Sequence, residues 1–224
     1  REKEVKILVF PELSITSYSC GDLFQQQVLL DSGEEQLKRL VEYSRGLDMV
    51  LVVGLPVRCD QQLFNGAVLL SEGRILGVVP KTFLPNHREF HEKRWFASAI
   101  NSLSHSVQLA GQEVPFGADL LFQCTEYPDL RIGIEISEDL WMPIPPSTSQ
   151  CLHGATLILN PSASTETVGN HEYRRALVQQ QSARCMTGYI YVSAGQGEST
   201  TDVVFSGHSM IAENGVILAE SERF

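Results

Sequence analysis

The fold of this chain is limited chiefly by a series of short apolar runs in which apolar and polar residues do not strictly alternate. The runs are "VKILVF", "MVLVVGLPVR", "LRIGIEI", "ATLILN" and "YIYVSAG". Strands buried on both faces have this pattern, whereas strands with one solvent-facing side alternate. Apolar residues at helical spacing occur at 31–47, and a further helix is predicted at 172–188. We therefore predict an α/β fold, with sheets covered by helices, in one domain spanning residues 1–224.

Two glycine-containing turns predict β-hairpins. Glu72-Gly73 separates two apolar runs, and Asn214-Gly215 divides the last one. Asn-Gly is the strongest short hairpin signal because both residues accept a positive φ. Residues 82–96 are polar and aromatic without a regular period. We predict a loop there that leads into a short helix.

Charge and composition exclude several kinds of partner. The 27 acidic and 17 basic residues give a formal net charge of −10, which disfavours nucleic acid or an anionic membrane as the main partner. No uncharged apolar run reaches about 18 residues, and the opening "REKEVK" lacks the apolar core of a signal peptide. The five cysteines are dispersed, so we predict reduced thiols and a cytoplasmic protein. Cysteines and histidines lack metal-ligand spacing, and we predict no metal site.

Three polar residues each follow directly after a predicted strand. Glu12 follows "ILVFP", Lys81 follows "ILGVVP", and Ser137 follows "RIGIEI". Taken singly, each has an ordinary explanation: a solvated acid, an exposed cation and a hydroxyl that caps a helix or turn. Strand ends on one edge of a sheet converge in space, and α/β proteins commonly build their sites there. We therefore expect the three side chains to lie together.

An acid, an amine and a nucleophile at one point can carry out acyl transfer. The carboxylate accepts the proton of the nucleophile, while the ammonium and backbone N–H groups stabilise the oxyanion. A carboxylate and a lysine do not readily activate a serine hydroxyl, which is a much weaker acid than a thiol. The arrangement therefore requires a cysteine at the position of Ser137.

Several longer blocks carry a family resemblance. "FPELSITSY", "VVPKTFLPN" and "GIEISEDLW" resemble the glutamate, lysine and cysteine motifs of the nitrilase superfamily, with the cysteine replaced. "GRILGVVPKTFLPNHREFHEKRWF" and "GQGESTTDVVFSGHSMIAENG" resemble more closely the glutaminase domain of glutamine-dependent NAD synthetases. The resemblance implies a nitrilase-like four-layer α-β-β-α sandwich that hydrolyses L-glutamine to glutamate and ammonia. In that family the ammonia passes through a tunnel to an ATP-using synthetase domain, where it attacks the adenylated form of nicotinic acid adenine dinucleotide.

The same resemblance indicates that the chain is part of a longer enzyme. The first strand and helix of the family's domain are missing, and no synthetase segment follows Phe224. We therefore expect no cofactor in residues 1–224, with ATP and magnesium confined to the absent synthetase domain. The expected partners are L-glutamine, the synthetase domain of the same enzyme and further copies of the chain in a homo-oligomer.

The resemblance also implies catalytic roles, position by position. Glu12 matches the general base, Lys81 the lysine that supports the oxyanion, and Ser137 the nucleophilic cysteine. Glu89, eight residues after Lys81, matches the second glutamate, which orients the lysine. The backbone N–H of Glu138 would complete the oxyanion hole.

Six residues match positions that bind glutamine in the family. They are Tyr18, His87, Glu138, Trp141, Ser164 and Asn170. An acid for the ammonium and hydrogen-bond donors for the carboxylate suit a free amino acid. Three positions depart from the family: His87 replaces a tyrosine, Asn170 replaces a basic residue, and Ser17 replaces a glycine. The ordinary alternatives are half-buried aromatic residues, a turn hydroxyl and an acid at a helix start.

Three explanations of Ser137 are open. We favour an engineered exchange of cysteine for serine, which preserves the shape and removes the thiolate. A naturally degenerate domain comes second, and a working serine hydrolase third, because no Ser-His-Asp arrangement is visible around this position. Two alternative functions are also open: another nitrilase-superfamily amidase or carbamoylase, and a non-catalytic assembly domain.

Overall fold

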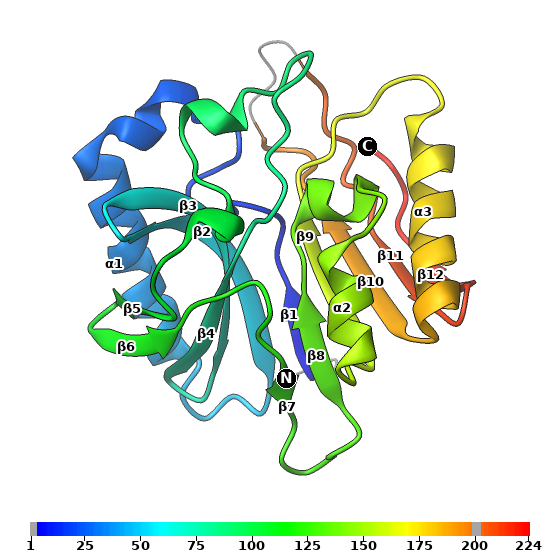
Figure 1. Cartoon of the computed structure of the whole chain (residues 1–224), viewed down its shortest axis with the longest axis horizontal. Coiled ribbons are helices and arrows are strands. Elements are labelled where there is room, and N and C mark those ends of the chain that lie inside the picture. The colour runs from blue at the N-terminus through cyan, green and yellow to red at the C-terminus, as the bar shows by residue number, and fades with distance from the viewer. Residues whose placement is uncertain (1–3, 199–202) are drawn as a thin grey trace.

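The computed structural model has four layers: a helix, two facing sheets and a second layer of helices (Figure 1). It describes residues 4–198 and 203–224. The predicted α-β-β-α arrangement is therefore confirmed. Within the described residues, no helix has the length and apolar character needed to cross a membrane.

The first sheet has the order β1-β2-β3-β4 and is covered on its outer face by α1 (Gln27–Tyr43). Its strands are β1 (Ile7–Val9), β2 (Val50–Cys59), β3 (Gln62–Ser71) and β4 (Arg74–Pro80). β1 is parallel to β2, and β2, β3 and β4 are antiparallel neighbours, so β1 and β4 end at the same edge. Leu37 and Val41, four residues apart on one face of α1, pack against Val53 and Phe64 of the sheet.

The second sheet has the order β12-β11-β10-β9-β8-β7. Its strands are β7 (Phe122–Gln123), β8 (Arg131–Ile134), β9 (Leu157–Ser162), β10 (Gly188–Ser193), β11 (Met210–Glu213) and β12 (Val216–Glu220). β8, β9 and β10 are parallel, whereas β7, β11 and β12 pair antiparallel to their neighbours. α2 (Pro146–Leu152) and α3 (Asn170–Cys185) cover its outer face, where Val178 packs with Ile158 and Tyr189.

The two sheets meet through aliphatic side chains. Val52 and Leu69 of the first sheet pack with Ile134 and Leu159 of the second, and all four are buried. Central strands of both sheets are therefore buried on two faces, which is why their sequences do not alternate. A proline inside a strand usually marks an edge of the sheet. Pro56 follows this rule, because β1 pairs with β2 only over 50–52 and β2 is therefore an edge strand at residue 56.

Both predicted hairpins are confirmed, and several short elements are additional. Glu72-Gly73 joins β3 to β4, and Asn214-Gly215 joins β11 to β12, each with two positive φ values. The short helix predicted after the 82–96 loop is η2 (Glu92–Arg94), which lies within the last part of it. Elements that the sequence patterns do not indicate are α2, the hairpin of β5 (Ser106–Leu109) and β6 (Gln112–Pro115), η1 (Gly21–Gln25) and η3 (Ala99–Asn101).

Candidate active site

Glu12 lies in the loop after β1 and is held against β2 by a close backbone approach. A Cβ on Gly54 would lie 2.3 Å from the backbone nitrogen of Leu13, so only glycine leaves room for this loop. The Glu12 side chain is buried, and its Oε1 accepts hydrogen bonds from Asn65 Nδ2 (2.6 Å) and Lys81 Nζ (2.7 Å). Its Oε2 is buried without a hydrogen-bond partner among the described residues. One carboxylate oxygen is therefore free to accept a proton.

Lys81 follows β4 and forms the centre of a buried charge cluster. Its Nζ lies 2.7 Å from Glu12 Oε1 and 2.7 Å from Glu92 Oε1. Burial by itself lowers the pKa of Lys81, but the two carboxylates outweigh this effect and raise the pKa above its ordinary value. The lysine therefore stays protonated near neutral pH. The two carboxylates use two of its three N–H groups, which leaves one for an oxyanion.

Lys81 contacts Glu92 rather than the predicted Glu89. Glu89 is exposed, and its carboxylate accepts a hydrogen bond from the Thr165 hydroxyl (3.1 Å). The 82–96 loop runs outward and returns through η2, where the Glu92 N–H bonds to the Pro85 carbonyl (3.1 Å). This return turns Glu92 inward. The assignment of the second glutamate is therefore corrected from Glu89 to Glu92.

We expect Glu92 to make the protein less stable as the pH rises toward neutrality. Burial raises the pKa of Glu92 from 4.5 to about 7, with the charge of Lys81 opposing the shift and that of Glu12 adding to it. Between these values the folded protein holds a proton that the unfolded chain releases, so the free energy of unfolding falls as the pH rises. Relative to Glu92→Gln, the unmodified protein should lose on the order of 2 kcal/mol between about pH 5 and about pH 8. Urea unfolding at fixed ionic strength measures this difference, and equal pH slopes in the two proteins would contradict it.

Ser137 is the first residue of η4 (Ser137–Trp141) and has a left-handed backbone, with a φ of 47°. Its N–H donates to Asn160 Oδ1 (2.9 Å), and its Oγ accepts a hydrogen bond from Ser162 Oγ (3.0 Å). The Ser162 carbonyl accepts the Glu12 N–H (3.3 Å). Among the described residues, no direct hydrogen bond joins Ser137 to Glu12 or Lys81. The structure connects the two parts of the site through the end of β9.

The three strand-end residues come from both sheets, which corrects the expectation of a single sheet edge. Glu12 and Lys81 follow β1 and β4 of the first sheet, and Ser137 follows β8 of the second. The facing sheets bring these ends together across the sandwich. The candidate site therefore lies at the rim of the interface between the sheets.

Asp139 ties the two sides of this rim together. Its buried carboxylate accepts the N–H of Thr82 (3.2 Å), that of the next residue (2.7 Å) and, on the other side, that of Ile136 (2.9 Å). Thr82 follows Lys81 directly, and Ile136 precedes Ser137. One carboxyl group thus fixes the segment after Lys81 relative to the turn of Ser137.

The backbone N–H of Glu138 is the unoccupied donor of this turn. The N–H of Ser137 is engaged by Asn160, and that of Asp139 by the Ile136 carbonyl (3.0 Å). Within the described ranges, no acceptor is found for the Glu138 N–H. The Glu138 side chain is half-buried, and burial raises the pKa of its carboxyl while the charge of Lys81 opposes the shift. This geometry suits the predicted oxyanion role, which stays a prediction.

Tyr18 links the charge cluster to a cleft. Its hydroxyl donates to Glu92 Oε1 (2.8 Å), and its ring packs edge to face on Phe205, with 6.0 Å between centroids. The Glu198 carboxylate accepts the Tyr18 backbone N–H (3.0 Å) and so fixes the loop. A cleft of about 520 Å³ is bordered by Tyr18, Phe205 and Glu89 among others. The structure therefore brings Tyr18 to the cluster and places Glu89 on the cleft wall.

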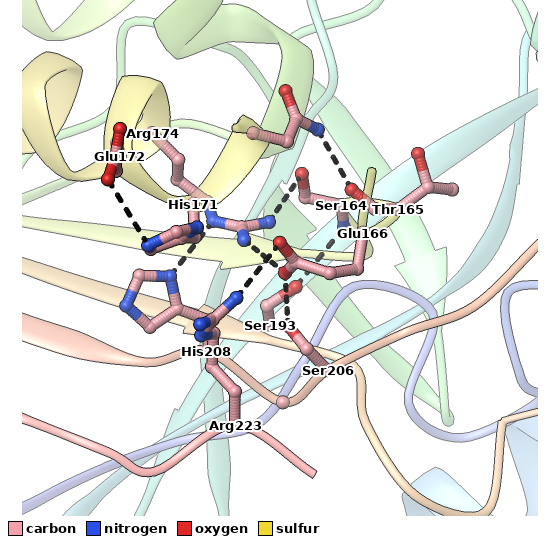
Figure 2. Close-up of polar contacts among 12 residues, drawn as sticks. Ser164, Thr165, Glu166, His171, Glu172, Arg174, Ser193, Ser206, His208 and Arg223 are labelled. Carbon is pink, nitrogen blue, oxygen red and sulfur yellow. Dashed lines mark hydrogen bonds and ion pairs between the residues drawn. The ribbon is translucent and has the colours of Figure 1, made fainter. Parts of the chain in front are cut away.

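Ser164 is held by a completely buried cation, Arg174 (Figure 2). Arg174 Nη1 donates to Ser164 Oγ (2.9 Å), Nη2 to Glu166 Oε2 (2.6 Å) and Nε to His208 Nδ1 (3.2 Å). A guanidinium can only donate, so Ser164 Oγ accepts and its own O–H points to another partner. The hydroxyl of Ser164 is therefore oriented as a donor.

The other three predicted substrate residues have the following positions. The Trp141 ring packs on that of Tyr173 at 5.4 Å between centroids. Asn170 begins α3, and its Nδ2 donates to the Thr165 carbonyl (2.9 Å). His87 is exposed on the 82–96 loop. Of the six residues predicted to bind substrate, only Tyr18 contacts the Lys81 cluster through a hydrogen bond in the described structure.

Four residues that build the site were not predicted from the sequence: Glu92, Asp139, Asn160 and Ser162. Each had a signal in the sequence, since Glu92 and Asp139 are acids inside the blocks of the family resemblance. Asn160 and Ser162 are polar residues at the end of the apolar run of β9, which is the same signal that identified Glu12. In the part of the chain that the structure describes, no group of three or more His, Cys, Asp or Glu residues could hold a metal ion.

Comparison with known proteins identifies related sequences along the whole chain. The family model of the carbon-nitrogen hydrolases matches residues 1–224. The glutamine-dependent NAD(+) synthetases of Mycobacterium tuberculosis and Mycobacterium leprae are 46% and 43% identical over 97% and 98% of this chain. The match covers 32% of either relative, so the chain spans about a third of their length.

Solved structures share the fold. A glutamine-dependent NAD(+) synthetase from Cytophaga hutchinsonii has a TM-score of 0.85 at 31% identity, covering 99% of this chain and 35% of that chain. An amidase of the nitrilase superfamily from Nesterenkonia AN1 has a TM-score of 0.76 at 19% identity, covering 100% of this chain and 76% of that one. The likeness to the amidase concerns the fold alone. The predicted nitrilase-like sandwich is confirmed by both.

Proposed function

The chain belongs to the carbon-nitrogen hydrolase family, and from this premise we propose that it is the L-glutamine-hydrolysing part of a glutamine-dependent NAD synthetase. The proposal rests on the buried cluster of Glu12, Lys81 and Glu92 beside the strained turn of Ser137. The similarity to NAD(+) synthetases over 97% of the chain favours glutamine over other amides as the substrate.

With a thiol at position 137, the reaction has two steps. Glu12 Oε2 accepts the thiol proton, and the sulfur attacks the side-chain amide carbon of glutamine. The carbonyl oxygen becomes an oxyanion, which the Lys81 ammonium and the Glu138 N–H stabilise. Glu12 returns the proton to the nitrogen, the C–N bond breaks, and ammonia leaves a thioester. Water deprotonated by Glu12 then attacks the thioester, which releases glutamate and restores the thiol.

Ser137 blocks this reaction at the first step. A hydroxyl is a far weaker acid than a thiol, and a carboxylate is too weak a base to ionise it. The hydroxyl fits the space, since its oxygen accepts a hydrogen bond from Ser162. We infer that the chain with Ser137 binds glutamine and does not turn it over.

The groups around the turn suit a free amino acid. The half-buried carboxylate of Glu138 is a partner for the ammonium of glutamine. Tyr18 donates its hydrogen to Glu92 and so offers only its oxygen, again an acceptor for the ammonium. The oriented O–H of Ser164 is a donor for the carboxylate. His87, Trp141 and Asn170 are proposed to border the same site.

The proposed partner is an ATP-using synthetase part that takes up the ammonia. The relatives are about three times as long as this chain, which leaves room in them for such a part. ATP and magnesium belong there, and residues 1–224 need no cofactor for amide hydrolysis. We also propose a homo-oligomer, and a cytoplasmic location in keeping with five free cysteines.

A substrate panel with the Ser137→Cys protein tests the function. Ammonia release from L-glutamine should exceed that from acetamide or N-carbamoyl-L-alanine by roughly 10²-fold or more in kcat/KM, because these lack the ammonium–carboxylate pair. Faster turnover of acetamide would favour an aliphatic amidase, and faster turnover of the carbamoyl compound a carbamoylase. If a folded Ser137→Cys protein turns over none of them, a non-catalytic assembly domain becomes the better explanation.

A further inference from the structure

A further buried carboxylate, Glu135, lies next to the nucleophile turn and takes no part in the charge cluster. It follows β8 directly and is 1% exposed. Among the residues that the structure describes, no lysine or arginine forms an ion pair with it. One oxygen accepts the N–H of Ser147 (2.8 Å), and the other accepts the hydroxyl of Tyr189. Both oxygens are acceptors, which suits a carboxylate even though burial raises the pKa of Glu135.

A series of hydrogen bonds leads from residue 137 to Glu135, and in each of them the donor lies on the side of residue 137. The backbone N–H of Ser137 can only donate, so the atom of Asn160 that lies 2.9 Å from it is the carbonyl oxygen Oδ1. The amide nitrogen of Asn160 therefore donates to the Tyr189 hydroxyl oxygen (2.9 Å). The hydroxyl hydrogen of Tyr189 in turn goes to Glu135. This chain of bonds, the Glu135 relay, connects the backbone N–H of residue 137 to a buried negative charge.

We propose that Glu135 is a positioning residue that acts through Tyr189 and Asn160 to hold the backbone of residue 137 in its left-handed conformation. The catalytic consequence of this inference rests on the proposed function. A φ of 47° at a residue other than glycine persists where neighbouring groups over-determine it. By engaging the N–H of residue 137, the relay also leaves the next N–H, that of Glu138, as the one directed at the oxyanion.

Glu135→Gln tests the direction of the relay, because it keeps the shape and turns one acceptor into a donor. Both neighbours of the carboxylate, the Ser147 N–H and the Tyr189 hydroxyl, donate to it, so one of them loses its acceptor. The Ser147 N–H can only donate, whereas the Tyr189 hydroxyl can also accept, so the new amide nitrogen faces Tyr189 and every later bond reverses. Asn160 then turns its amide nitrogen toward the N–H of Ser137, and that bond is lost.

Hydrogen exchange of the Ser137 amide, measured by NMR on the unmodified protein and its variants, tests the relay without any catalytic assay. In Tyr189→Phe and Glu135→Gln, this amide should exchange roughly tenfold faster relative to the other protected amides of the second sheet. The effect is local because only one bond of the turn is released.

Tyr191→Phe is the matched control. Tyr191 lies two residues further along β10, is equally buried, and hydrogen-bonds through its hydroxyl to Ser162 Oγ (2.7 Å). Ser162 in turn contacts the side-chain oxygen of Ser137 and not its backbone N–H. Tyr189→Phe and Tyr191→Phe therefore each remove one buried hydroxyl group from the same strand. Equal exchange of the Ser137 amide in Tyr189→Phe and Tyr191→Phe would overturn the proposal, since the relay would then have only a general structural role.

Kinetics in the Ser137→Cys background separate positioning from substrate binding. Tyr189→Phe should lower kcat roughly tenfold and change KM by less than about twofold, because the relay holds the nucleophile and not the substrate. An unchanged kcat, or a change confined to KM, would overturn the proposal. If the Ser137→Cys parent does not hydrolyse glutamine, the proposed function fails, and the exchange experiment still decides whether the relay holds the turn.

Discussion

Replacing Ser137 by cysteine should raise the rate of ammonia release from L-glutamine by roughly 10⁴-fold or more, as loss of a nucleophile lowers rates by this order. The charges and donors are in place: Glu12 has a free, buried oxygen, and Lys81 stays protonated. A thiol of pKa about 8.5 can give up its proton to this cluster, whereas a hydroxyl cannot. The two proteins are compared side by side by coupled detection of ammonia.

Two observations control this comparison. Ser137→Ala removes the nucleophile altogether and should be as inactive as the protein with Ser137. Glutamine titration by calorimetry should give similar affinities for the serine and alanine proteins, because the proposed ammonium and carboxylate partners are unchanged. If the protein with Ser137 hydrolyses glutamine within about tenfold of the cysteine variant, the hydroxyl is a working nucleophile and our account of the block is refuted.

Lys81→Met should abolish glutamine hydrolysis in the Ser137→Cys background and also destabilise the protein by about 3–5 kcal/mol. Methionine has a similar length but no charge, so Glu12 and Glu92 remain in the interior without a cation. The oxyanion loses its ammonium donor at the same time. Ammonia release and urea unfolding measure the two effects.

A double variant separates the two consequences of losing Lys81. Adding Glu12→Gln to Lys81→Met removes one of the two carboxylates that faced the lysine and should restore a large part of the stability, but none of the activity. Glu12→Gln in the cysteine background, which retains the lysine, should also be inactive because the base is lost. Near-full activity in either Lys81→Met or Glu12→Gln would refute the proposed mechanism.

The strands were predictable because a strand buried on two faces has a continuous apolar sequence. Runs such as those of β2, β8 and β9 lack alternation, and the Asn214-Gly215 turn is encoded locally by two residues that accept a positive φ. The sequence of α2 shows no such pattern. It is only seven residues long, and it is held by tertiary packing rather than by its own periodicity.

The site was predictable only where chemistry coincides with a strand end. Glu12, Lys81 and Ser137 were found in this way, but their origin in two different sheets was not, because sequence does not show which strands pair. Glu92 was missed because counting residues along a loop cannot show where the loop returns to the core. Tyr189, which accepts a hydrogen bond from Asn160, lies 29 residues further along the chain. No local sequence pattern could therefore have indicated the Glu135 relay.

The contacts of Asp139 and Ser162 have a consequence for how the molecule assembles. Each of them connects the nucleophile side, built on the second sheet, to a segment that leaves the first sheet. A folding intermediate in which one sheet has formed and the other has not would contain only one half of the site, either the cluster of Glu12 and Lys81 or the turn of Ser137. The geometry of the site forms only when the two halves of the sandwich dock, so recovery of activity by the Ser137→Cys protein during refolding reports the docking step itself.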